Sequence, residues 1–160
     1  MNGKEQKRYY KEFQNPGFIQ ELVLKGIKRE YIEKIEEFAK GLGKNFEPTQ
    51  MYRIFNDLVK INDEVRRKDK KDIDLNDFHK RLLVLRPRIA YTFARIIDRS
   101  RDRDKEIIDT FKRFIINSID IITDENSEKA IDYFKNFFDV YESILAYHKA
   151  AIVMKSDRRR

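Results

Sequence analysis

Apolar residues recur every three or four positions over most of the chain, the spacing that places them on one face of an α-helix. This pattern predicts helices over roughly residues 28–41, 49–67, 74–97, 104–122 and 127–154. The polar residues before them predict a basic arm over 1–17, in which Tyr9 and Tyr10 dock or stay disordered and Asn15-Pro16-Gly17 is a turn signal. The expected architecture is all-α, a single domain over 18–154 with five or six helices, followed by a basic tail over 155–160.

Local signals refine these boundaries. Thr49 and Asp74 are expected N-caps, as is Asn126 or Ser127. The charged run from Arg66 to Asp72 is expected to be a solvated loop. Pro87 falls inside a helical pattern, where it removes one backbone hydrogen bond, so we expect a kink or a restart there. On a continuous helical wheel Arg86 points into the apolar arc, so either Pro87 shifts the register or Arg86 extends to the surface.

Composition supports long helices with charged outer faces. Hydrophobic residues make up 41% of the chain and charged residues 39%, whereas five Gly and three Pro supply little turn chemistry for an all-β fold. The chain contains no Cys, which excludes disulfides, zinc knuckles and thiol catalysis. No apolar run approaches a membrane span and no signal peptide is visible, so we expect a cytoplasmic protein without membrane contact.

The net charge of +7 is unevenly distributed. Residues 81–103 contain seven Arg against two Asp, whereas residues 104–154 contain six Lys or Arg against ten acids. This separation suggests one surface for a polyanion and another for a basic protein neighbour, with Glu128, Asp132 and Asp139 as candidate acids. Uneven solvation of an ordinary surface is the alternative.

Catalytic and metal-binding templates do not fit. His79 and His148 are the two histidines, and neither follows an Arg by four to six residues, as an all-helical ribonuclease of the HEPN kind would require. Asp72, Asp74 and Asn76 resemble the opening of a calcium loop, but Asp77 and Leu83 stand where that loop needs Gly and Glu. We therefore expect no catalytic residue, no metal site and no cofactor.

The clearest chemical feature is a stripe of arginines. With Arg81 as the reference on a helical wheel, Arg88, Thr92, Arg95 and Arg99 all fall within about 40° of it. Arg53, Asn56 and Lys60 likewise share one side of the preceding helix. Guanidinium groups bind phosphate through paired hydrogen bonds, so the stripe favours a nucleic-acid backbone read without sequence specificity. A solvated face balanced by nearby acids, or an interface to an acidic partner, remains open.

Three segments together resemble a known family. Leu82-Leu83-Val84-Leu85-Arg86-Pro87-Arg88-Ile89-Ala90-Tyr91 followed by Arg95 is similar to the central signature of small subunits of the type III-A CRISPR effector, the Csm complex. Thr49-Gln50-Met51-Tyr52-Arg53 resembles the family's earlier helix, and the stretch from Phe137 to Lys149 its C-terminal helix. The matching order covers about residues 45–150.

The resemblance implies a non-catalytic helical bundle that assembles in several copies as an inner filament. Its partners would be crRNA, target RNA, the Csm backbone and large subunits, and copies of itself, while RNA and DNA cleavage belong to the other subunits. Matched by position, Arg53, Arg86, Arg88 and Arg95 are candidate RNA-binding residues; Lys60, Arg81 and Arg99 join them from the wheel. A DNA-binding helical regulator and a helical protein–protein adaptor are the two rival interpretations.

Overall fold

The computed structural model describes residues 11–43, 46 and 48–158, and these residues form α-helices and one short 3-10 helix, with no strand among them. The elements are α2 (Pro16–Lys25), α3 (Arg29–Gly41), α4 (Pro48–Arg67), η1 (Lys70–Asp72), α5 (Leu75–Arg99), α6 (Asp102–Asp124) and α7 (Lys129–Arg158). The expected all-α class and the five long helical segments are confirmed. The expectation for Tyr9 and Tyr10 concerns residues outside the described ranges.

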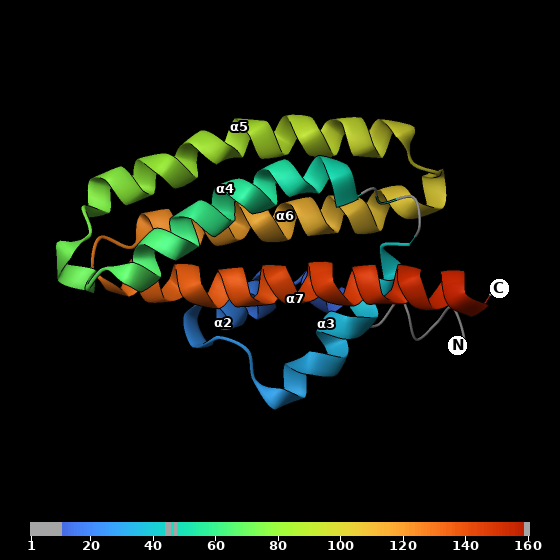
Figure 1. Ribbon diagram of the computed structural model, residues 1–160, viewed down its shortest axis with the longest axis horizontal. Helices are drawn as coiled ribbons and strands as arrows, with labels where there is room; N and C mark the ends of the chain where they lie inside the picture. The colour runs from blue at the N-terminus through green and yellow to red at the C-terminus, as the bar shows by residue number, and fades with distance from the viewer. Residues whose placement is uncertain (1–10, 44–45, 47, 159–160) are drawn as a thin grey trace.

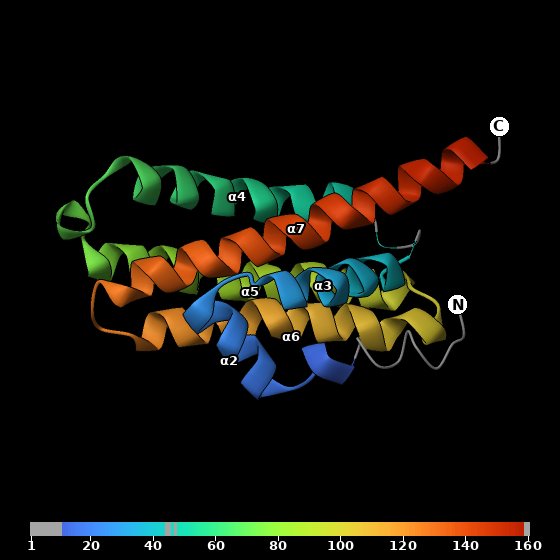
Figure 2. The same ribbon diagram turned by 90° about the horizontal axis from the view of Figure 1, so that it is seen from below.

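The four longest helices form the body of the bundle. Helix α4 packs on α5 and α7, α5 packs on α6, and α6 packs on α7, which closes a ring of four helices. Figures 1 and 2 show these helices lying roughly lengthwise along the molecule. The shorter α2 and α3 cover one side, where α2 contacts α6 and α7, and α3 contacts α7. No helix in the described ranges is long and apolar enough to cross a lipid bilayer.

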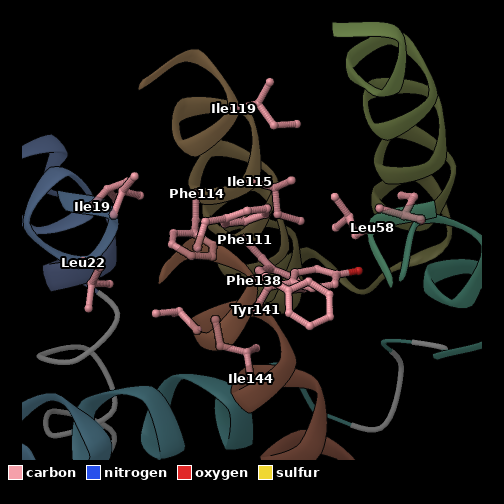
Figure 3. Close-up of a cluster of buried hydrophobic side chains, with 14 of the residues drawn as sticks. Ile19, Leu22, Leu58, Phe111, Phe114, Ile115, Ile119, Phe138, Tyr141 and Ile144 are labelled. Carbon is pink, nitrogen blue, oxygen red and sulfur yellow. The ribbon is translucent and has the colours of Figure 1, made fainter. Parts of the chain in front are cut away.

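Large aromatic and branched side chains fill the centre of this ring. Phe111 and Tyr141 are fully buried and their rings stack at 6.0 Å between centroids, which joins α6 to α7. Leu58 brings α4 into the same cluster, and Ile19 and Leu22 bring in α2 (Figure 3). Burial of this apolar surface is the main force that holds the helices together. The ring is closed by its own core, and the outer faces of α4 and α5 carry side chains that are exposed among the described residues.

Helix α2 was missed by the sequence analysis. Asn15 caps it, since its side-chain oxygen accepts a hydrogen bond from the Gly17 amide at 2.9 Å, and Pro16 occupies the first helical position. The sequence Asn15-Pro16-Gly17 is typical of a turn as well as of a helix start. Helix α2 is also only 10 residues long, so its apolar periodicity is weak. The segment expected to belong to an arm also packs in part, because Phe13 is buried against Phe38 with ring centroids 4.2 Å apart.

Helix α5 is continuous through Pro87. The chain is helical from Leu75 to Arg99, so the expected restart does not occur; Figure 1 shows the helix bowed rather than straight. Pro87 is exposed, and its ring therefore lies on the outer side of the helix. Loss of a hydrogen bond on that side is tolerated because water can satisfy the freed carbonyl group.

The capping predictions have mixed outcomes. Asp74 caps α5 by accepting a hydrogen bond from the Asp77 amide at 3.2 Å, which explains this acid without a calcium loop. Ser127 accepts a hydrogen bond from the Lys129 amide at 3.3 Å at the start of α7. The prediction for Thr49 is wrong, because α4 begins at Pro48 and Thr49 lies inside its first turn. The predicted loop over Arg66–Asp72 is partly wrong, since Lys70–Asp72 form η1, whereas α4 ends at Arg67 as expected.

Candidate nucleic-acid interface

Two adjoining hollows lie along the line where α4 meets α5. The larger has a volume of about 520 Å³ and is lined by Thr49, Arg53, Arg88, Tyr91, Thr92 and Arg95. The smaller has a volume of about 290 Å³ and is lined by Asp57, Lys60, Ile61, Lys80, Arg81, Val84, Leu85 and Arg88. Arg88 borders both. We call this pair of hollows the α4–α5 seam.

Helical periodicity explains why cations gather in the seam. On α5, residues such as Leu82, Ile89 and Phe93 are buried, and these positions fix which side of the helix faces the core. Arg81, Arg88 and Arg95 follow one another at a spacing of seven residues, close to two helical turns, so they share the flank next to α4. The seam is thus a consequence of two amphipathic helices packed side by side.

Two of the seam arginines are held by acids across the helix pair. Arg81 of α5 pairs with Glu64 of α4, and Arg88 of α5 pairs with Asp57 of α4. Partial burial raises the pKa of Glu64, but the hydrogen bonds and positive charges of Arg81 and Lys68 outweigh it and leave the pKa below its ordinary value. Each pair is partly exposed and contributes little to stability. Its main effect is to orient the guanidinium and to neutralise part of its charge.

Four other predicted residues carry charge that is not balanced in this way. Arg53, Lys60, Arg95 and Arg99 are exposed and make no ion pair with any residue that the structure describes. The Arg95 guanidinium lies over the ring of Tyr91, 5.7 Å from its centroid. This contact orients the cation without neutralising it. Unpaired guanidinium and ammonium groups are the ones most available to an anionic ligand.

The predicted set divides by position. Arg53, Lys60, Arg81, Arg88 and Arg95 line the seam. Arg99 is exposed one turn beyond Arg95 on α5 but borders neither hollow.

Arg86 lies on the opposite flank of α5. It is exposed and pairs with Asp120 of α6 at 3.2 Å. The question that the helical wheel left open is therefore settled: the register holds through Pro87, and Arg86 extends to the surface beside α6. Arg86 therefore lies apart from the seam, and its contact with RNA, expected from the family resemblance, stays a prediction.

Sequence reasoning missed one cation of the seam. Lys80 borders the smaller hollow together with Arg81. It stands eight residues before Arg88, a little over two turns, and that spacing could have indicated a shared flank. The helical-wheel argument for this helix considered arginines and not lysines, so it did not include Lys80.

Part of the acidic charge of residues 104–154 is neutralised by ion pairs within the molecule. Asp132 of α7 pairs with Lys70 of η1 at 2.6 Å, and Asp139 of α7 pairs with Arg66 of α4 at 3.1 Å. These two ion pairs link α7 to the last turn of α4 and to η1. They therefore offer less charge to a basic neighbour than the sequence suggested.

The two histidines lie apart from the seam. His148 is buried and its Nε2–H donates a hydrogen bond to the Gly43 carbonyl oxygen at 2.8 Å. Burial lowers the pKa of His148, and the hydrogen bond to Gly43 opposes this only in part. His79 is half-buried beside Phe78. Over the described ranges, no three His, Asp or Glu side chains gather closely enough to hold a metal ion.

Fold and site together define the class: a small all-α protein whose cation-lined seam lies between two long helices. The family model described as Csm2 Type III-A matches residues 27–152. The chain therefore belongs to the Csm2 Type III-A family, a family of small subunits of the type III-A CRISPR Csm complex. Such subunits are structural components of that complex. Neither a curated protein nor a solved structure gives a significant match to the chain.

Proposed function

We propose that this subunit binds crRNA and target RNA through the α4–α5 seam and the adjoining Arg99, without sequence specificity and without catalysis. In the same proposal it forms the inner filament of the complex with copies of itself, beside the backbone and large subunits. One observation supports the RNA contact above all others. Arg53, Lys60, Arg95 and Arg99 lie on two adjoining helices and have no acidic partner among the described residues.

The chemistry of the seam suits a phosphate backbone. Arginine keeps its charge at any relevant pH and can give two parallel hydrogen bonds to one phosphate. Several cations along one line match the repeat of charge along a nucleic-acid strand, and neutralised phosphates release counterions. A guide RNA changes its sequence from one complex to the next, so the protein must hold the backbone rather than read bases.

The assembly part of the proposal rests on a different face. Leu83, Pro87, Ala90 and Ala94 are exposed and recur at helical spacing on the outer side of α5, between the seam and Arg86. Leu83 keeps 45% of its surface exposed, and with Pro87, Ala90 and Ala94 it forms one apolar stripe; exposed apolar patches are typical of protein contact sites. We call these four residues the outer stripe of α5. It fits a contact with a neighbouring subunit.

RNA binding by the purified full chain tests the proposal. The variant Arg53→Ala/Arg95→Ala/Arg99→Ala should bind a labelled single-stranded RNA at least about tenfold more weakly at low salt. The slope of log affinity against log salt should fall by about 2, because three phosphate contacts are lost. Fluorescence anisotropy over a range of salt concentrations measures both quantities.

A charge-matched control separates local from overall electrostatics. Lys25→Ala/Lys28→Ala/Lys40→Ala removes the same charge from exposed positions on and between α2 and α3. This control should keep most of the RNA affinity. Equal losses in the two triple variants, or no loss in either, would contradict the assignment of the seam. Tighter binding of duplex DNA than of RNA would favour the rival regulator.

A further inference from the structure

We propose that the larger hollow of the seam holds one unpaired nucleotide of the bound strand. Its phosphate would lie among Arg53, Arg88 and Arg95, and its base would stack on the aromatic surface of Tyr91. This inference rests on the proposed RNA contact and goes further, because a seam that holds only the backbone needs no place for a base.

The position of Tyr91 is the first observation. Its side chain is 64% exposed, and it lines the larger hollow of the seam from α5. The Arg95 guanidinium covers part of its ring at 5.7 Å from the centroid. A tyrosine held by a cation on an exposed helical face is a rigid, flat, apolar surface. Such surfaces stack with nucleobases, and the stack tolerates any base because every base has a π-face.

The second observation is the contrast between the two hollows. The larger has a volume of about 520 Å³ and combines three guanidinium groups with one aromatic ring and the side chains of Thr49 and Thr92. That volume lies within the range of small-ligand pockets. The smaller hollow has a volume of about 290 Å³ and is bordered by cations, aliphatic groups and the carboxylate of Asp57, with no aromatic side chain among the described residues that line it. Only the larger one therefore offers partners for both the phosphate and the base of a nucleotide.

The charge balance at the larger hollow adds a third observation. Arg88 is neutralised in part by Asp57, whereas Arg53 and Arg95 have no acidic partner among the described residues. The first turn of α4, which includes Thr49, also borders the hollow, and a helix N-terminus carries partial positive charge. The hollow thus offers positive charge to a phosphate and an exposed aromatic ring to a base.

A bound nucleotide in this position must have its base out of a base pair. A base stacked inside a continuous duplex has both faces covered by its neighbours, so it cannot also cover Tyr91. The contact therefore favours single-stranded RNA, or a strand with one base turned outward, over an uninterrupted duplex.

The test is the affinity of the full chain for a single-stranded RNA and for a ribose–phosphate oligomer of equal length without bases. Tyr91→Leu should weaken binding of the RNA by roughly tenfold, while Tyr91→Phe should bind within about twofold of the unaltered protein. The salt slope should stay unchanged in both variants, because no charge is removed. Neither variant should alter the affinity for the oligomer without bases.

Tyr52→Leu is the matched control, since Tyr52 is the exposed tyrosine of α4, 42% exposed, and borders neither hollow of the seam. It should leave RNA binding unchanged. Uridine monophosphate, added as a competitor at millimolar concentration, should not displace the RNA. Displacement at micromolar concentration would assign the hollow to a free nucleotide and overturn the proposal.

Equal affinity of Tyr91→Leu and the unaltered protein for RNA would also overturn the base contact. If the arginine triple variant still lost RNA binding in that case, the proposed function would stand without this inference. If the arginine variant bound normally as well, both would fail.

Discussion

Arg81, Arg88 and Arg95 follow one another at equal spacing on α5, yet each has a different partner. Arg81 pairs with Glu64, Arg88 with Asp57, and Arg95 with the ring of Tyr91. The sequence places all three arginines on one flank of α5. Two of their partners lie on α4, and the third, Tyr91, lies one turn away on α5 itself. At the scale of the residue, the partner decides whether a guanidinium is available to a ligand or is already engaged.

His148 should make the fold sensitive to mild acid. Because the folded-state pKa of His148 is lowered, the unfolded chain binds a proton more readily than the folded chain. Stability is therefore full above the unfolded value of about 6.5 and is lost as the pH falls from there toward the folded pKa. The loss approaches about 1.4 kcal/mol for each pH unit within that window. Urea unfolding at pH 7.5 and pH 5.5 measures it.

His148→Gln keeps an N–H donor for the Gly43 carbonyl oxygen but cannot titrate. Its stability should differ less between the two pH values than that of the unaltered protein. An identical loss of stability in both proteins would assign the acid sensitivity to other groups.

The buried hydroxyl group of Tyr141 is expected to lower the stability of the fold slightly. It is buried and finds no hydrogen-bond partner among the described residues, and burial raises the pKa of this phenol. Tyr141→Phe keeps the ring that stacks on Phe111 and removes only the unpaired group. The free energy of unfolding should stay equal or rise by about 1 kcal/mol. A loss of more than about 1 kcal/mol in chemical denaturation would reveal a partner that the hydroxyl group needs.

At the scale of the element, the seam depends on how two helices face each other. Asp57 of α4 neutralises Arg88 and borders the smaller hollow. Asp57→Asn should tighten RNA binding by about fivefold, since one repulsive charge is removed and one guanidinium is released. Asp63→Asn is the matched control, because Asp63 is an exposed acid of α4 that borders neither hollow. Anisotropy titrations in which both variants behave alike would contradict a local role for Asp57.

How much the sequence could predict also differs between elements. The helices after residue 28 could be placed to within a few residues, because their apolar stripes are long and regular. Helix α2 could not, because a ten-residue element gives a weak pattern and its Asn15-Pro16 start resembles a turn. The continuity of α5 through Pro87 could not be predicted either, since it depends on which side of the helix the proline faces.

The candidate site was predictable only in part, for the same reason. The wheel places cations on a flank of one helix, and five of the seven predicted residues do line the seam. The ion pairs of Arg81 and Arg88, and that of Arg86 with α6, join residues 17 to 34 positions apart. Such contacts depend on the packing of helices, which periodicity alone does not determine.

At the scale of the whole molecule, different surfaces suit different partners. The seam presents cations, the outer stripe of α5 presents apolar groups, and the acids of α7 that pair with Arg66 and Lys70 are largely engaged. A subunit that lies between RNA and protein neighbours needs the first two surfaces side by side. Membership of the Csm2 Type III-A family means that the protein neighbours are the other subunits of the Csm complex.

The outer stripe yields a prediction about assembly. Leu83→Glu/Ala90→Glu places two charges on exposed positions, so the isolated protein should keep its helical circular dichroism and melting temperature. Its recovery with a tagged Csm complex should fall by at least about tenfold, because burial of two unpaired carboxylates at an interface is unfavourable. Lys25→Glu/Lys40→Glu, on α2 and α3, is the control and should assemble normally. Full incorporation of the stripe variant would show that no subunit covers it.

The most direct test of the account is crosslinking inside the complex. The chain would be reconstituted with the other subunits of its Csm complex, a guide RNA and a target RNA, irradiated with ultraviolet light and digested for mass spectrometry. We expect RNA-linked peptides from residues 49–60 of α4 and 88–99 of α5, with Tyr91 among the linked residues. Crosslinks confined to α2, α3 or α6 would contradict it.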